Sequence, residues 1–227
     1  MDRLLDDALA ASSVVANCAM NRERQLVGVN SYAKELGFSP LDRIRTRLST
    51  SGAAAWLDLC CGTGRALSQA AAQLRDEGLA ERVTLVGVDL VEHFDRVPDG
   101  LPVRLVCAPL GGWTPDRAFD LVTCVHGLHY VGDKLAALAR AASWLTADGY
   151  LAADLDLTAI RTPDGRPVRG LAAALRRCGV DYDPRRHRVT CTGRRALALP
   201  YSYLGADDRS GPNYTGQPAV TSYYRPR

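Results

Sequence analysis

The feature that most constrains this fold is an apolar run that breaks into a glycine turn and then opens a helix. Residues 55–59 are apolar apart from Asp58, and the turn after them contains Gly62 and Gly64. Strong helix formers continue over residues 65–74. A strand that turns through glycines into a helix is half of a βαβ unit, and a turn without side chains lets a ligand lie on the backbone. The sequence therefore predicts a ligand cradle here, and the alternative is an ordinary tight turn in some other α/β protein.

The next apolar run indicates which ligand the cradle would hold. Residues 83–88 are rich in valine and leucine, and the run ends in Asp89. Asp89 follows the glycine turn at close to the spacing of roughly 20 residues that places a carboxylate on a ribose. The turn does not fit G-x-G-x-x-G, because Cys60 replaces the first glycine and Leu67 stands where the third would be. A nucleoside is therefore favoured over a dinucleotide.

The rest of the chain continues the alternation of strands and helices. A helix capped by Asp133 and a second one over residues 170–178 are expected, together with further strands over residues 101–106, 119–125 and 150–154. The runs 187–192 and 196–203 flank a glycine turn and are expected to pair as an antiparallel hairpin. The pattern predicts an α/β fold: a doubly wound, Rossmann-like sheet of seven mostly parallel strands with a C-terminal antiparallel hairpin.

Three segments are expected along the chain. Residues 1–52 would be helical, with one helix over residues 2–19, a second over residues 33–37 and a third that begins at Ser39 and turns Leu41, Ile44 and Leu48 inward. Residues 53–204 would form the core. Residues 205–227 are rich in glycine, proline and tyrosine, and they are either disordered or packed against the body or a second subunit.

Composition excludes several classes of protein. The net charge of +3 is too small to indicate a polyanion partner by itself. Arginines gather after residue 160, which favours a solvated face over a patch for RNA or an anionic substrate. The seven cysteines include no C-x-x-C pair, so neither disulfides nor a metal site is expected. No signal peptide or long apolar run is seen, so we expect a cytoplasmic protein without a membrane span.

Three stretches together resemble the class I S-adenosylmethionine-dependent methyltransferases, in their small-molecule branch. Residues 57–64, Leu-Asp-Leu-Cys-Cys-Gly-Thr-Gly, resemble the first motif of that family, with cysteine for the leading glycine. Residues 87–90, Gly-Val-Asp-Leu, resemble the second motif. Residues 119–131, which include His126 and His129, are similar to the segment around the fourth strand. The resemblance implies S-adenosyl-L-methionine as the cofactor and a methyltransferase of class EC 2.1.1.

The same resemblance implies roles for individual residues. Asp89 would hold the ribose, and in this family the elements before the first strand form a lid over the site. Family members often carry an acid on the adenine, where this chain has Ala108, so backbone groups and apolar walls would hold that ring here. The residues implied in cofactor binding are Arg24, Tyr32, Asp58, Cys60, Gly62, Gly64, Asp89, Leu90, Ala108, Pro109, Leu110 and Cys124.

Candidate catalytic residues follow the fourth strand. His126 and His129 could each take a proton from the acceptor as a general base, although a histidine here is often structural. Asp154 and Asp156 are expected to be structural carboxylates more than acceptor ligands. Tyr130 and Lys134 spell the Y-x-x-x-K pair of short-chain dehydrogenases, but the helix starts too late to place both on one face.

The sequence thus predicts in-line methyl transfer to a small-molecule acceptor, with a secondary metabolite as the favoured class, by a monomer or homodimer. A nucleic-acid acceptor is disfavoured, because no Asn/Asp-Pro-Pro-aromatic run follows the fourth strand. The alternatives are an RNA or protein methyltransferase and a non-catalytic protein that retains the cofactor-binding fold.

Overall fold

The main element of the fold is a seven-stranded sheet. The structure, a computed structural model, describes residue 4, residue 9 and residues 12–16 and 23–227. The strand order is β3-β2-β1-β4-β5-β8-β7. The first five strands in this order pair in parallel, whereas β8 is antiparallel to both neighbours. The strands are β1 (Ala54–Leu59), β2 (Val83–Asp89), β3 (Val103–Cys107), β4 (Phe119–Cys124), β5 (Leu145–Asp154), β7 (Asp181–Asp183) and β8 (Arg188–Thr192). The predicted fold class is confirmed.

Helices cover both faces of this sheet. The α-helices are α2 (Ser13–Ala16), α4 (Tyr32–Leu36), α5 (Pro40–Ser51), α6 (Arg65–Asp76), α7 (Lys134–Ser143) and α8 (Leu171–Arg177). Three short 3₁₀ turns also occur: η1 (Ala80–Arg82), η2 (Gly127–Tyr130) and η3 (Leu157–Ala159). Trp56 packs in the core with residues of α5 and α6, while its neighbour Leu57 packs with residues of α7. Successive strand residues point to opposite faces, so β1 is buried on both.

Local sequence signals set the helix ends. Ser31 and Ser39 cap α4 and α5, since their side chains accept hydrogen bonds from the backbone of Lys34 and Asp42. Asp133 caps α7 in the same way. Each cap satisfies a backbone donor that lacks a partner within its helix. The expected starts of α5 at Ser39 and of α7 at Asp133 are confirmed.

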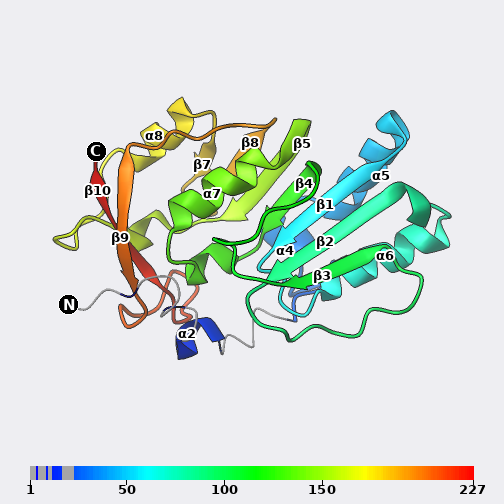
Figure 1. Ribbon diagram of the computed structural model, residues 1–227, viewed down its shortest axis with the longest axis horizontal. Helices are drawn as coiled ribbons and strands as arrows, with labels where there is room; N and C mark the ends of the chain where they lie inside the picture. Colours follow the sequence, from blue (N-terminus) through cyan, green and yellow to red (C-terminus); the bar gives the residue numbers. More distant parts are fainter. Residues whose placement is uncertain (1–3, 5–8, 10–11, 17–22) are drawn as a thin grey trace.

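A second sheet, which the sequence did not indicate, stands at the left of the molecule in Figure 1. It has the order β6-β10-β9, from β6 (Ile160–Arg161), β10 (Thr221–Pro226) and β9 (Tyr201–Asp207). Residues 205–227 therefore pack against the body, which was one of the alternatives to disorder that the sequence left open. The boundary that we drew between residues 204 and 205 falls inside β9.

Hydrogen bonds fasten β10 to the start of α7. The Tyr224 hydroxyl donates to Asp133 Oδ1 at 2.9 Å and accepts from the backbone of Leu135 at 3.1 Å. Lys134, which is fully buried, donates through Nζ to Ser222 Oγ at 3.0 Å. Lys134 therefore serves packing between the two sheets rather than a dehydrogenase-like site.

The expected hairpin of residues 187–192 and 196–203 is wrong. The first run is β8, but it pairs with β5 and with β7, and the second run leads into β9 of the other sheet. Gly193 donates its N–H to the Gly149 carbonyl at 2.8 Å, and Arg195 donates its N–H to that of Ala142 at 3.1 Å. The chain after Gly193 therefore follows the α7–β5 connection instead of turning back.

The expected helix over residues 2–19 is only partly described. Leu4 forms an antiparallel bridge with Ala206, with backbone hydrogen bonds in both directions, so Leu4 is not helical as the prediction required. Residues 13–16 are helical, as predicted. Asp2 and Cys18 lie outside the described residues. The strand expected over residues 150–154 begins earlier, because residues 146–149 also lie within β5, where the pairing with β4 shifts register between Phe119 and Leu121.

Candidate functional site

The turn between β1 and α6 is built as a cradle. Cys60, Gly62 and Gly64 have φ values of 55°, 60° and 77°, in the left-handed region. Glycine adopts this region freely, while cysteine does so at a cost of about 1–2 kcal/mol. A Cβ on Gly64 would lie 2.7 Å from the Leu105 side chain, so only glycine fits there. The turn thus approaches β3 closely and leaves its outer side open.

Asp89 is fixed at the end of β2 by the backbone. Its Oδ2 accepts the Gly62 N–H at 2.9 Å, and its Oδ1 accepts the Val91 N–H at 3.1 Å. A carboxylate oxygen accepts more than one hydrogen bond. Both oxygens are therefore oriented by the backbone at the end of β2.

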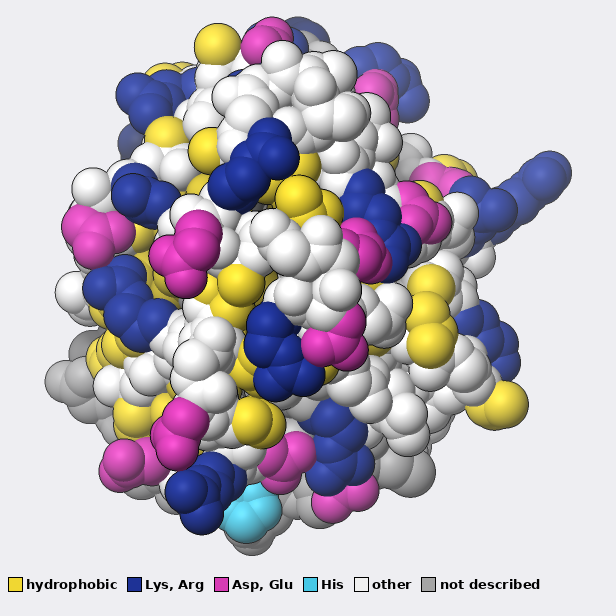
Figure 2. Space-filling model, turned by 90° about the vertical axis from the view of Figure 1, so that its right-hand side faces the viewer, with side chains coloured by type: hydrophobic (Ala, Val, Ile, Leu, Met, Phe, Trp, Pro, Cys, Tyr) yellow, Lys and Arg dark blue, Asp and Glu magenta, His cyan; other side chains and the backbone are white. Residues whose placement is uncertain are grey.

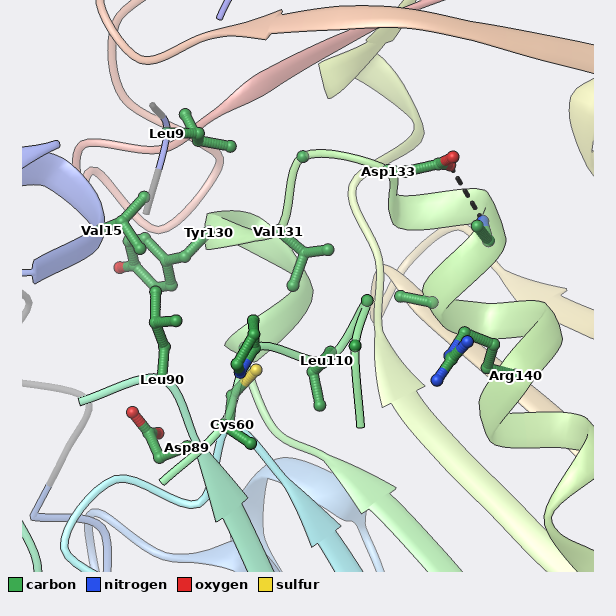
Figure 3. Close-up of a pocket in the computed structure, with 18 of the residues that line it drawn as sticks. Leu9, Val15, Cys60, Asp89, Leu90, Leu110, Tyr130, Val131, Asp133 and Arg140 are labelled. Carbon is green, nitrogen blue, oxygen red and sulfur yellow. Dashed lines mark hydrogen bonds between the residues drawn. The ribbon is translucent and has the colours of Figure 1, made fainter. Parts of the chain in front are cut away.

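A cavity of about 690 Å³ opens above these residues. In Figure 3, Asp89 and Leu90 lie on one side of it, Leu110 and Arg140 on the other, and Cys60 lies between them. The predicted site residues that line this cavity are Cys60, Gly62, Asp89, Leu90, Ala108, Pro109, Leu110 and His126. Residues of η2 and α7, together with Leu9 and Val15, complete the wall. The cradle, the acid and the apolar walls thus surround one cavity.

The other expected cofactor residues do not line the cavity, within the part of the chain that the structure describes. Tyr32 is buried on Asp58 of β1, Gly64 is buried against Leu105 of β3, and Cys124 is buried at the end of β4. Arg24 pairs with Glu35. Asp58 lies beneath the cradle with 1% of its surface exposed. These residues support the cavity floor from below.

Asp58 is the centre of a buried hydrogen-bond network. The hydroxyls of Tyr32 and Thr123 both donate to it at 2.6 Å, and Trp56 Nε1 donates to Thr123 Oγ1 at 2.8 Å. Burial raises the pKa of Asp58 to about 7, although the two hydroxyl hydrogen bonds oppose the rise. The network joins α4 to β1 and β4, so the N-terminal segment is fastened to the floor of the site.

His126 lies between Glu35 and His129 at the end of β4. Its Nε2 is 3.1 Å from Glu35 Oε2, and its Nδ1 is 3.3 Å from His129 Nε2. Arg24 donates to the other oxygen of Glu35 at 2.9 Å. The hydrogen bond with His126 lowers the pKa of Glu35 to about 2. Glu35 is therefore ionised near neutral pH, and it holds the proton of His126 on Nε2, which leaves Nδ1 as the basic atom.

The backbone of His126 is also constrained. Its φ is 58°, and its N–H donates to Asp154 Oδ2 at 3.1 Å. Burial raises the pKa of Asp154. Desolvation lowers the pKa of His129 to about 3, because only 1% of that residue is exposed. His129 therefore stays neutral beside His126.

A second group of side chains continues from this cluster. The His187 Nδ1 atom lies 3.4 Å from the Tyr182 hydroxyl and 3.9 Å from Asp156 Oδ1. The ring of Tyr214 stacks on His187. Asp156 accepts hydrogen bonds from the backbone and hydroxyl of Thr158, and Asp154 receives the His126 N–H, so both carboxylates have the structural roles that we expected.

Three residues of the site were not predicted from the sequence: Glu35, His187 and Tyr214. Glu35 comes from the N-terminal α4, His187 precedes β8, and Tyr214 lies between β9 and β10. One signal for Glu35 was present: it lies one helical turn after Tyr32, which we had placed at the site. No sequence signal would have placed Tyr214 here.

Residues 31–187 match the family model of the methyltransferase domain. The match covers more than half of the chain. The chain belongs to this methyltransferase family. The predicted class I, S-adenosylmethionine-dependent methyltransferase family is thereby confirmed, and S-adenosylmethionine is the cofactor of this class.

Solved structures with similar folds include further methyltransferases. An amino pentose methyltransferase of calicheamicin biosynthesis from Micromonospora echinaspora is 26% identical, with 62% of this chain and 55% of that one covered and a TM-score of 0.40. A sugar N-methyltransferase from Streptoalloteichus sp. is 27% identical, with 55% of this chain and 49% of that one covered and a TM-score of 0.36. The plantazolicin methyltransferase is 14% identical, with 65% of this chain and 52% of that one covered and a TM-score of 0.41. The chain spans about half the length of these proteins. No curated protein matches it.

Two searches of the described residues gave no further site. None of the described helices has the length and apolar character needed to cross a bilayer. No group of three or more His, Cys, Asp or Glu side chains is arranged to hold a metal ion within that same part of the chain.

Proposed function

We propose that this protein transfers a methyl group from S-adenosylmethionine to a small-molecule acceptor. The observation that carries the proposal is the position of His126: it lines the cavity that Asp89 and the glycine turn form, and it is paired with an ionised carboxylate. A cofactor cradle and an oriented base therefore share one cavity. A non-catalytic protein would need only the cradle.

The residues fit the cofactor. Gly127 lines the cavity, and a Cβ on it would lie 2.3 Å from the Cβ of Cys60. The turn after β4 therefore packs directly against the turn after β1. Asp89 would hold the ribose, and Leu90 and Leu110 would enclose the adenine. S-adenosylmethionine, when bound, would supply an electrophilic methyl group for in-line transfer to the acceptor, with S-adenosylhomocysteine as the leaving group. Positioning of the two reactants contributes most of the rate.

We assign His126 as the general base and His129 as the residue that positions it. An acceptor hydroxyl or ammonium would give its proton to His126 Nδ1, and the Glu35 carboxylate would stabilise the resulting imidazolium. The contact of Nδ1 with His129 is 3.3 Å, long enough for an acceptor to compete with it. His129 is buried and neutral, so it orients the imidazole without charging the site.

A small acceptor is favoured over a nucleic acid. The face in Figure 2 shows Lys and Arg interspersed with Asp and Glu, with no continuous basic patch in that view. Ion pairs such as Arg45 with Glu77 and Arg104 with Asp116 also neutralise some of the arginines. Methylation of a secondary metabolite in the reducing cytoplasm is the setting that we propose, and every described cysteine is a free thiol.

Calorimetric titration with S-adenosylhomocysteine tests the proposal, followed by assays of methyl transfer to a panel of small acceptors. Binding in the micromolar range is expected. His126→Ala should slow turnover and leave cofactor affinity unchanged. Absence of binding would refute the proposed function, and wild-type turnover by the variant at every pH would refute the role of His126.

A further inference from the structure

An aromatic ring lies beside the histidines at the reacting end of the site. Tyr214 is parallel to His187, with ring centroids 4.0 Å apart and planes at 9°. Its edge meets His129 at 5.4 Å and 79°. Its centroid is 6.3 Å from that of His126, which lines the cavity. Tyr214 thus lies next to His126, on the side where His129 and His187 stand.

The body of the protein holds His187 without help from Tyr214. Its carbonyl accepts the Leu155 N–H at 2.7 Å, and its φ of 49° fixes the turn before β8. At the edge of the imidazole ring, Nδ1 contacts the Tyr182 hydroxyl and Asp156. The imidazole is therefore a fixed platform for a flat ring.

Tyr214, in contrast, is held by its ring alone. It is 42% exposed, and its hydroxyl makes no hydrogen bond with any residue that the structure describes. The turn that carries it is closed by bonds of its own: Asn213 N–H to the Gln217 carbonyl and Gly216 N–H to the Asn213 carbonyl, both at 2.9 Å. The backbone of the turn is therefore closed independently of the contacts of the ring.

We propose that the acceptor is a planar aromatic compound whose ring takes the place of Tyr214 on the face of His187. This inference rests on the proposed function and names the class of its acceptor. A flat ring restores the stacking contact that the displaced tyrosine gives up, whereas a saturated sugar or aliphatic amine does not. A hydroxyl or amino substituent on that ring then lies next to His126.

The matched probes 2-naphthol and decahydro-2-naphthol test the proposal, because they share a hydroxyl and a carbon skeleton and differ in planarity. Their binding is measured by calorimetric titration of each probe into protein saturated with S-adenosylhomocysteine. We expect 2-naphthol to bind at least tenfold more tightly. Tyr214→Ala should tighten its binding by about 2- to 10-fold, the factor produced by one aromatic contact, because no ring has to be displaced.

Two further variants separate platform from fold. His187→Ala should weaken 2-naphthol binding by about 2- to 10-fold, and His187→Phe should restore it, because a ring is again present. Equal binding of the two probes, or binding that Tyr214→Ala leaves unchanged or weakens, would overturn the inference. If S-adenosylhomocysteine binds and these results fail, only the acceptor class is wrong; if it does not bind, the proposed function itself fails.

Discussion

Replacing Glu35 by glutamine tests the pair at the centre of the proposed chemistry. The substitution keeps the shape of the side chain and removes the charge that faces His126 Nε2 at 3.1 Å and Arg24 at 2.9 Å. In the wild type this carboxylate stabilises the imidazolium that forms when His126 takes a proton. Loss of a hydrogen bond to a charged group costs about 1.5–3 kcal/mol. We therefore expect kcat to fall by about 10- to 150-fold.

The same substitution should lower stability by a smaller amount. The pKa of Glu35 falls from 4.5 to about 2 in the folded protein, which corresponds to about 3 kcal/mol at 1.36 kcal/mol per pH unit. The side chain is 31% exposed, and solvent screens part of this energy, so about 1–2 kcal/mol is expected. Because the folded-state pKa is lowered, this contribution is complete above pH 4.5 and is lost as the pH falls toward 2.

The assay is S-adenosylhomocysteine formation at saturating cofactor, combined with urea unfolding at pH 7. Lys34→Gln, an exposed change on the same helix, is the matched control and should leave both quantities unchanged. A purely structural role for Glu35 predicts lower stability with an unchanged kcat for the folded fraction. Wild-type kcat in Glu35→Gln would refute the assignment of His126 as a base oriented by this carboxylate.

Three further predictions follow from other contacts. Asp89→Ala should weaken S-adenosylhomocysteine binding by about 1.5–3 kcal/mol in calorimetry, and an unchanged Kd would contradict the placement of the ribose. The pKa of His129 is about 3 in the folded protein, against an ordinary value of 6.5, so the free energy of unfolding should fall by about 2 kcal/mol between pH 6.5 and pH 5. Unfolding curves should show this fall in the control variant His93→Gln, and the fall should be absent in His129→Phe. Tyr224→Phe should cost about 1–3 kcal/mol in urea unfolding by leaving the Leu135 N–H without its partner, whereas Tyr201→Phe on β9 should cost much less.

Periodicity and caps made most of the main sheet predictable. Runs that are apolar on both faces, such as residues 55–59, can only be central strands of a covered parallel sheet. The caps at Ser39 and Asp133 are local signals, because each side chain bonds to a backbone N–H three residues later. Signals of this range do not depend on the rest of the fold.

The hairpin prediction failed because a glycine signals a turn without naming the partner strand. Gly193 has a φ of 76°, as a hairpin turn would need, but its N–H bonds to Gly149. The observed hairpin, β7 with β8, turns without glycine, and His187 adopts the positive φ instead. Pairing between distant strands decided the outcome, and a single sequence carries no record of it.

The site divides in the same way. Asp89 and the glycine turn were predictable, because a βαβ unit brings adjacent strand ends together. Glu35 and Tyr214 reach His126 from opposite ends of the chain, through α4 and through the turn between β9 and β10. Contacts of this kind depend on how separate segments dock, so only the structure shows them.

The position of β10 has a consequence for biosynthesis. It is the middle strand of its sheet, between β6 and β9, and it closes on the first turn of α7. All strands of the larger sheet leave the ribosome before residue 193, yet residues 221–226 must emerge before that helix end is covered. A nascent chain therefore exposes the α7 terminus, and with it one wall of the cavity, until residues 221–226 have emerged.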